Sequence, residues 1–433
     1  MNHHFHAAAI WIAITLAGNA LAGEVRTNWV TSWYAASQPG WDSTFVLPMN
    51  VPASLEDETV CEYVRISAGG DRIKLVFSNR YGKVPLDIGA VSVMTRAVTF
   101  EGMRHVMIPP GTTVTSDPIT LPVKPLALLQ VTTYLPRRTA ITGFHWGASQ
   151  RISVAAGNAR QAADFLKAAR VEGRLFLSAV LVDALPGGRT VVALGDSITD
   201  GNGSTPDADQ RWPDFLARRL APHGIAVANA GISGARLLKD GMGDSALARF
   251  DHDVLGQPGV ADVIVLLGIN DIGWPGSPFA LAEPMVTPDE LTAGFRQLAL
   301  VAQARGIRIT VGTLPPFEGA LEGTPFAGHY SPQKEALRLR LNDWIRGAGI
   351  FDGVVDFDAV LRDPARPQRM QAAFDSGDHL HPGDAGYRRM ADAIDIGAIV
   401  ARDPGARREA ASARTERAGR ISPCRRCVRP DPA

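Results

Sequence analysis

The stretch VVALGDSITDG, residues 191–201, decides the fold of this chain. Its first four residues are apolar and favour a strand that is buried on both faces of a parallel sheet. Gly195 and Asp196 end the apolar run and place Ser197 just beyond the strand. Open α/β sheets bind ligands outside the carboxyl ends of their strands, so Ser197 is a candidate functional residue. The alternative is that Ser197 only caps a following helix.

Strand and helix patterns alternate from residue 189 to residue 400. Apolar strands are predicted at 191–194, 226–230, 263–267, 307–312 and 353–357. Helices are predicted at 211–222, 288–305 and 333–347. Such alternation predicts an α/β domain with a parallel sheet and helices on both of its faces.

Three later stretches carry further polar residues in a consistent order along the chain. They are NAGISG at 229–234, VIVLLGIND at 263–271 and DHLHP at 378–382. Together with the Gly-Asp-Ser at 195–197, they resemble in content and order the motifs of the SGNH hydrolases, also called the GDSL esterase/lipase family. The resemblance covers about residues 189–400 and implies a three-layer α/β/α, flavodoxin-like hydrolase domain. The G-x-S-x-G turn of the α/β-hydrolases does not occur around the serine.

Acyl transfer by a serine needs a base that takes the hydroxyl proton and an acid that orients the base. His381 is the candidate base, and Asp378, three residues earlier, is the candidate acid. The D-x-x-H spacing of the family selects this pair, with Ser197 as the nucleophile. The same loop also holds His379 and Asp375. The alternative interpretation is a turn-capping aspartate and a surface histidine.

The tetrahedral intermediate of acyl transfer needs donors aimed at its oxyanion. The resemblance implies the backbone N–H of Ser197, the backbone N–H of Gly234 and the side-chain amide of Asn270. Gly231 is the nearest competitor, although Gly234 matches the N-A-x-x-S-G run of the family. Both glycines could serve loop geometry alone, and Asn270 could cap the next helix.

The sequence pattern of residues 24–185 predicts an all-β domain. Alternating segments at 62–68 and 72–78 flank a Gly-Gly pair and predict a hairpin. Further strands are predicted at 90–96, 127–134 and 174–183. Short strands between turn-rich stretches favour a sandwich or jelly roll. The segments WVTSW at 29–33 and FSNRYG at 77–82 resemble the amino-terminal β-domain of some bacterial GDSL-type esterases, a resemblance that implies no chemistry.

The two ends of the chain differ from its body. Residues 1–22 have the apolar run and the Ala-Leu-Ala ending of an export signal, and the run is too short for a membrane span. Residues 402–433 hold nine arginines and four acidic residues, which predicts a disordered basic tail. We therefore predict a signal peptide (1–22), a β-sandwich domain (24–185), a Pro-Gly-Gly-Arg linker (186–189), a hydrolase domain (189–400) and a tail (402–433).

Lysine and arginine number 44, as do aspartate and glutamate, so no net field would attract nucleic acid or an anionic membrane. Cys61 is alone in the body, and Cys424 and Cys427 lack the further ligands of a zinc site. No H-E-x-x-H, P-loop or zinc-finger spacing occurs, so we expect no metal and no cofactor. His105 and His145 are interpreted as structural.

The sequence thus predicts a periplasmic or secreted serine esterase without stable membrane insertion; it leaves the oligomeric state open. Aromatic-rich loops at 272–290 and 314–332 could wall the substrate pocket or simply pack against each other. The substrate could be a small ester, an acylated polysaccharide or a lipid; analogy with other β-domains favours the carbohydrate. The alternative from another class is a carbohydrate-binding protein with an inactive hydrolase domain, and the intact triad residues argue against it.

Overall fold

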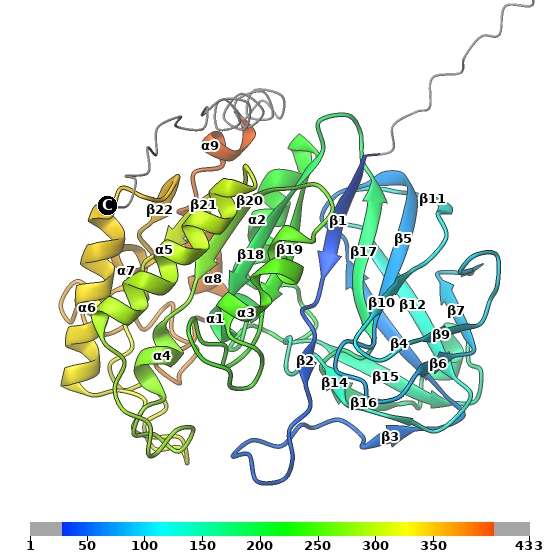
Figure 1. Cartoon of the computed structure of the whole chain (residues 1–433), viewed down its shortest axis with the longest axis horizontal. Coiled ribbons are helices and arrows are strands. Elements are labelled where there is room, and N and C mark those ends of the chain that lie inside the picture. The colour runs from blue at the N-terminus through cyan, green and yellow to red at the C-terminus, as the bar shows by residue number, and fades with distance from the viewer. Residues whose placement is uncertain (1–27, 402–433) are drawn as a thin grey trace, which may run out of the picture.

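The computed structural model describes residues 28–401, which form two packed domains (Figure 1). The amino-terminal domain consists of antiparallel sheets, and the carboxyl-terminal domain has a parallel sheet with helices around it. The predicted signal peptide at 1–22 and the predicted basic tail at 402–433, with Cys424 and Cys427, lie outside the described residues.

The first domain is a sandwich of two larger antiparallel sheets. Their strands are β1 (Trp29–Tyr34), β4 (Glu58–Arg65), β5 (Gly70–Ser78), β7 (Ala90–Val93), β8 (Arg96–Ala97), β10 (Thr113–Thr115), β11 (Ile119–Val123), β12 (Leu128–Leu135), β15 (Arg151–Ala156), β16 (Ala169–Glu172) and β17 (Leu177–Asp183). One sheet has the order β1-β17-β5-β10, with β11 also on β5, and the other has the order β16-β15-β4-β12-β7-β8. Apolar side chains from both sheets form one core, so the predicted sandwich is confirmed.

Three short strand pairs and a turn of 3-10 helix complete this domain. The pairs are β2 (Gln38–Pro39) with β14 (Gly143–Phe144), β3 (Ser54–Leu55) with β13 (Thr139–Ala140), and β6 (Leu86–Ile88) with β9 (Val106–Ile108). The 3-10 turn is Ala162–Phe165.

The hairpin predicted from residues 62–68 and 72–78 is wrong. β4 pairs with β12 and β15 in one sheet, whereas β5 pairs with β17, β10 and β11 in the other. The turn between them crosses from sheet to sheet and is held by Ser32, whose Oγ donates to the carbonyl oxygen of Ala68 and accepts from its N–H. A Cβ on Gly69 would lie 2.4 Å from the carbonyl oxygen of Val123. The glycine therefore permits close backbone packing rather than a hairpin turn.

The second domain is built on five parallel strands in the order β19-β18-β20-β21-β22. They are β18 (Arg189–Gly195), β19 (Ile225–Gly231), β20 (Val260–Leu266), β21 (Arg308–Gly312) and β22 (Gly353–Val355). In chain order this is 2-1-3-4-5, the order of flavodoxin-like sheets. Every residue of β18 is buried, as a central parallel strand requires. The predicted three-layer domain is confirmed.

Helices cover both faces of this sheet (Figure 1). They are α1 (Ser197–Asp200), α2 (Trp212–Leu220), α3 (Ala246–Phe250), α4 (Ile269–Gly273), α5 (Pro288–Ala304), α6 (Pro332–Gly347), α7 (Phe357–Leu361), α8 (Asp384–Asp392) and α9 (Ile396–Val400). α5 begins at a capping box between Thr287 and Glu290, and Ser331 caps α6. Within residues 28–401 no helix is both long and apolar enough to cross a bilayer.

β1 joins the two domains. It is an edge strand of the sandwich, and it lies against β18 and β19 of the parallel sheet. The N–H of Thr31 donates to Oγ1 of Thr190, 3.0 Å away, at the beginning of β18. The hydroxyl of Ser67 donates to the carbonyl oxygen of Ser32 at 2.6 Å and accepts from the N–H of Val227 in β19 at 2.9 Å. These buried polar contacts fix the relative position of the domains.

A second contact between the domains lies at the carboxyl ends of β18 and β19. The hydroxyl of Tyr34, at the end of β1, donates to Asp253. Asp253 also accepts from the buried guanidinium of Arg249, which donates to the carbonyl oxygens of Gly195 and Ala230 at the ends of β18 and β19. A tyrosine of the sandwich therefore supports the guanidinium that ties the two central strands together.

Replacing Tyr34 with Phe is expected to lower the free energy of unfolding by about 1.5–3 kcal/mol, the contribution of a hydrogen bond to a charged group. Urea unfolding of the full chain measures the change. Tyr63→Phe is the matched control, because Tyr63 is 42% exposed, and its effect should stay within about 0.5 kcal/mol. Equal unfolding free energies for Tyr34→Phe and the wild type would contradict this role of the hydroxyl.

Candidate active site

Ser197 lies where β18 passes into α1, at the carboxyl edge of the sheet. The N-cap of α1 is Asp196 rather than Ser197, since the Asp196 side chain accepts from the N–H of Ile198 at 3.0 Å. A Cβ on Gly195 would lie 2.0 Å from Oγ1 of Thr199. Only glycine therefore permits the tight passage from strand to helix that puts the serine at this edge.

The imidazole of His381 contacts both other residues of the predicted triad. Its Nε2 lies 2.8 Å from Oγ of Ser197, and its Nδ1 lies 2.6 Å from Oδ2 of Asp378. The other oxygen of Asp378 accepts from the N–H groups of Leu380 and His381. Burial alone would raise the pKa of Asp378, but His381 and these N–H groups hold it well below its ordinary value. The carboxylate therefore stays ionised at neutral pH.

The loop also contains a second histidine–aspartate pair. Nδ1 of His379 lies 2.6 Å from Oδ2 of Asp375, and the side chain of His379 is 41% exposed. Of the two pairs in this loop, it is Asp378 and His381 that reach Ser197. The structure therefore distinguishes the pair that contacts the serine from the second pair in the same loop.

Asn270 follows β20 and lies in the first turn of α4. The N-cap of that helix is Gly268, so capping is not what places an asparagine here. Nδ2 of Asn270 donates to the carbonyl oxygen of Ala235, 3.0 Å away. An amide nitrogen carries two hydrogens, so this bond leaves a second N–H for a ligand.

Gly234 adopts a left-handed conformation with φ 71°. A Cβ there would lie 2.5 Å from Sδ of Met242 and 3.0 Å from the ring of Trp274, so a side chain would not fit. Gly231 has a different constraint, since a Cβ there would lie 2.3 Å from the backbone nitrogen of Asp200. Gly231 thus allows β19 to pack on α1, whereas Gly234 lies in the loop beyond it.

Sequence reasoning assigned no role to Asp271, although it ends the quoted motif at 263–271. Its carboxylate is buried and accepts from the N–H groups of Leu237 and Leu238 at 2.7 and 3.0 Å. With Asn270 bonded to Ala235, the beginning of α4 holds the loop that follows Gly234. The sequence feature that could have indicated this role is the aspartate directly after Asn270.

Aromatic rings from both domains form one connected group near the loop of Gly234. Trp274 stacks on Phe279 with centroids 4.9 Å apart, and Phe279 stacks on Phe326 at 5.2 Å. Phe45 of the sandwich lies 6.4 Å from Phe279, and Trp41 lies 5.1 Å from Phe45. The loops predicted as aromatic walls do pack on each other. The contribution of the sandwich was missed, because no local pattern links residues so far apart.

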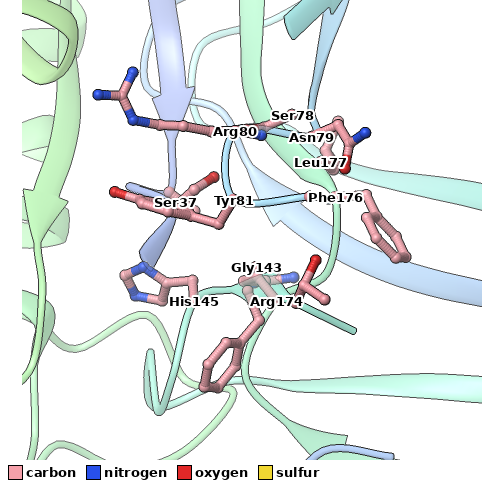
Figure 2. Close-up of a pocket in the computed structure, with 14 residues that line it drawn as sticks. Ser37, Ser78, Asn79, Arg80, Tyr81, Gly143, His145, Arg174, Phe176 and Leu177 are labelled. Atoms are coloured by element: carbon pink, nitrogen blue, oxygen red, sulfur yellow. The ribbon is translucent and has the colours of Figure 1, made fainter. Parts of the chain in front are cut away.

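A hollow lies within the sandwich, apart from these site residues (Figure 2). It is lined by residues such as Ser37, Arg80, Tyr81 and His145, and Ser197 and His381 are not among its lining residues. Among residues 28–401 no group of three or more His, Cys, Asp or Glu side chains is arranged to hold a metal ion.

Asp196 is fully buried beside the serine. Burial raises its pKa to about 7, although the N–H of Ile198 and the positive charge of His381 oppose this. Its Oδ2 has no hydrogen-bond partner among the described residues. Below about pH 7 the folded protein therefore favours the protonated form of this carboxyl.

Asp196→Asn should remove a pH dependence of stability. The pKa of an unfolded aspartate is about 3.9, so between pH 4 and 7 the folded wild type binds more protons here and loses stability as the pH rises. The advantage of the variant in unfolding free energy should grow over this window, by at most about 1.4 kcal/mol per pH unit.

Urea unfolding at pH 4 and at pH 7 measures the difference in unfolding free energy between the variant and the wild type. Asp289→Asn, at an exposed aspartate, is the control for replacing a carboxylate with an amide. A difference between Asp196→Asn and the wild type that stays constant, or shrinks, as the pH rises would contradict the buried site.

Residues 193–389 match the model of the GDSL-like Lipase/Acylhydrolase family. This span contains all five predicted site residues: Ser197, Gly234, Asn270, Asp378 and His381. The carboxyl-terminal domain belongs to the GDSL-like lipase/acylhydrolase family. The predicted resemblance is confirmed, and the domain is an ester hydrolase domain.

Solved structures similar to the chain cover about half of it. A GDSL-like lipase from Bacteroides thetaiotaomicron is 20% identical, with 49% of this chain and 87% of that chain covered and a TM-score of 0.35. A mutant of an acetyl-xylooligosaccharide esterase from Geobacillus Stearmophilus is 24% identical, with 51% and 97% covered and a TM-score of 0.34. An alpha/beta hydrolase enzyme from the metagenome of Lake Arreo, Spain, is 21% identical, with 48% and 94% covered and a TM-score of 0.35. No curated protein gives a significant match.

Proposed function

We propose that this protein is an exported serine esterase that hydrolyses carboxylic esters through an acyl-enzyme. The observation that carries the proposal is the chain of contacts from Ser197 through His381 to Asp378, at 2.8 and 2.6 Å. A serine needs a base within hydrogen-bond reach, and the base needs an acid at its other nitrogen. Both requirements are met within a domain of a hydrolase family.

In the first half-reaction, Oγ of Ser197 attacks the ester carbonyl carbon while Nε2 of His381 takes the hydroxyl proton. Asp378 keeps Nε2 turned toward the serine and stabilises the imidazolium. The tetrahedral intermediate then collapses. The bond to the alcohol oxygen breaks, the imidazolium gives its proton to that oxygen, and the acyl group remains on the serine.

In the second half-reaction, water takes the place of the alcohol. Nε2 of His381 accepts a proton from the water as its oxygen attacks the acyl carbon. Collapse of this second intermediate breaks the bond to Oγ, and the proton returns from the imidazolium to Ser197. The products are a carboxylic acid and free enzyme, and these steps move protons among water, substrate, serine and histidine without a cofactor.

Both intermediates carry a negative oxygen. The backbone N–H groups of Ser197 and Gly234 and the second N–H of Asn270 are the proposed donors to it. Support for Asn270 comes from its tether to Ala235, which holds the amide beside the loop of Gly234. Donors fixed before the reaction stabilise developing charge without reorganising.

The proposed substrate is an ester on a small molecule or a polysaccharide, with no nucleic-acid partner. Support comes from the half-buried rings of Phe279 and Phe326, which stack next to the buried Trp274 beside the loop of Gly234. Aromatic rings provide large, rigid contact faces for apolar surface. The same rings would accommodate a lipid acyl chain, which makes a lipid ester the second candidate.

Replacing Ser197 with Ala should lower kcat for p-nitrophenyl acetate on the order of 10⁴-fold or more, and His381→Ala should lower it by about 10²–10⁴-fold. His379→Asn is the matched control in the same loop. Asparagine tolerates the left-handed conformation of His379, and this variant should keep a kcat close to the wild-type value. Initial rates give the result. Turnover that survives Ser197→Ala would contradict the nucleophile.

Asn270→Ala should lower kcat by about 10²–10³-fold, because a donor to the oxyanion acts mainly in the transition state. KM for p-nitrophenyl acetate should change little. Steady-state kinetics separate the two constants, and thermal unfolding checks that the loop contact to Ala235 is not essential for folding. A rise in KM at unchanged kcat would contradict the proposed donor role.

Export is supported by the apolar run and the Ala-Leu-Ala sequence within residues 1–22. Expression of the full chain in a bacterium should yield a periplasmic or secreted protein whose first residue follows Ala22. Amino-terminal sequencing of the recovered protein provides the check. A protein that keeps residues 1–22 and stays in the cytoplasm would contradict export.

A further inference from the structure

His145 of the sandwich is buried, with 4% of its surface exposed. It lies between β14 and β15, and Figure 2 shows its imidazole turned away from Phe176 on the opposite side of the view. Nδ1 lies 2.7 Å from the carbonyl oxygen of Ala36, and Nε2 lies 2.8 Å from Oδ1 of Asp200 in the hydrolase domain. A carbonyl oxygen only accepts, so Nδ1 carries a hydrogen and the ring orientation is fixed.

Asp200 connects this histidine to two parts of the active site. It is the last residue of α1, three positions after Ser197, and is 1% exposed. Its other oxygen, Oδ2, accepts from the hydroxyl of Ser233 at 2.7 Å. Ser233 directly precedes Gly234. A continuous chain of hydrogen bonds therefore runs from the sandwich, through the helix of the nucleophile, to the proposed oxyanion loop.

The backbone around His145 is held against the same helix. The hydroxyl of Ser149 donates to the carbonyl oxygen of Gly201 at 2.7 Å, and the carbonyl oxygen of Ser149 accepts from the N–H of Asp207. Ala148 and Ser149 both have positive φ, 63° and 47°. Such conformations cost on the order of 1–3 kcal/mol each and persist only where the surroundings enforce them. The loop that contains Ala148 and Ser149 is therefore strained where it packs on the end of α1.

We propose that His145 is a positioning residue for the esterase reaction. Through its hydrogen bond to Asp200, the sandwich fixes the Ser233–Gly234 segment relative to Ser197. His145 does not touch the reacting atoms; it acts through Asp200 and Ser233. The proposal rests on the proposed function, because the distance between nucleophile and oxyanion donor matters only if both act on one substrate.

The physical reason is that contacts to a transition state tolerate only small displacements of the donor. An oxyanion donor works within about 2.7–3.1 Å of the developing charge, and a displacement of about 1 Å can slow a reaction on the order of 10²-fold. Without its hydrogen bond to His145, the buried carboxylate of Asp200 can shift, and Ser233, which is bonded to it, shifts with it. The loss should therefore appear in kcat rather than in KM.

Two variants at the same position separate the two hydrogen bonds of the ring. In His145→Asn, the shorter amide replaces Nδ1 and keeps the bond to Ala36, while Asp200 loses its partner. In His145→Gln, the longer amide reaches the position of Nε2 and keeps a hydrogen-bond partner for Asp200, because an amide presents both a donor and an acceptor, while Ala36 loses its partner. Each variant removes one buried hydrogen bond, so each serves as the control for the other.

For p-nitrophenyl acetate, His145→Asn should lower kcat by about 10- to 100-fold at nearly unchanged KM. His145→Gln should restore most of the wild-type kcat. Thermal unfolding is measured for both variants and should show similar losses. Equal kcat values for the two variants, or a kcat of His145→Asn equal to that of the wild type, would overturn the proposal.

Ser233→Ala is the second test, and it replaces the first if His145→Asn does not fold. It removes the hydroxyl that Asp200 holds, so kcat should fall while KM stays nearly constant, and an unchanged kcat would overturn the proposal. Turnover that depends on Ser197 is established first in the wild type. Its absence would contradict the proposed function, whereas its presence with no effect at His145 or Ser233 would contradict only this inference.

Discussion

The hydrogen bond between Nε2 of His381 and Oγ of Ser197 joins residues that are 184 positions apart in the chain. The parallel sheet places Ser197 at the edge where its strands end, and the loop between α7 and α8 brings His381 to the same edge. Further contacts lock the two segments together. Asp384 accepts from the backbone N–H and the hydroxyl of Thr205, and Tyr387 donates to the carbonyl oxygen of Asn202. The helix after the histidine is thus tied to the turn after the serine.

The sandwich contributes to the same edge from the other side. Tyr34 supports the Asp253–Arg249 pair, whose guanidinium holds the ends of β18 and β19. His145 holds Asp200 at the end of α1. Both contacts are buried and charged or strongly polar, so removing one partner costs the other a buried hydrogen bond. The two domains therefore form one structural unit around the serine.

The sequence predicted much of the hydrolase domain because its signals are local. Apolar runs marked the strands, the Gly-Asp-Ser motif lay at a strand end, and the Asp-x-x-His spacing matched the family. It failed for the turn at Gly69, because alternation shows which face of a strand is buried but not which strand is its partner. It also missed the bond from His145 to Asp200, since two residues 55 positions apart leave no local pattern. Tertiary contacts of this kind appear only in the folded chain.

The central claim is that Ser197, and no other residue, is activated as a nucleophile by His381. A fluorophosphonate reacts covalently with an activated serine and stays attached, so mass spectrometry of the digested protein locates the reactive residue directly. The account predicts a single adduct, on the peptide that contains Ser197, and strongly slowed labelling in His381→Ala. An adduct on a different residue, or equal labelling rates in the wild type and His381→Ala, would contradict it.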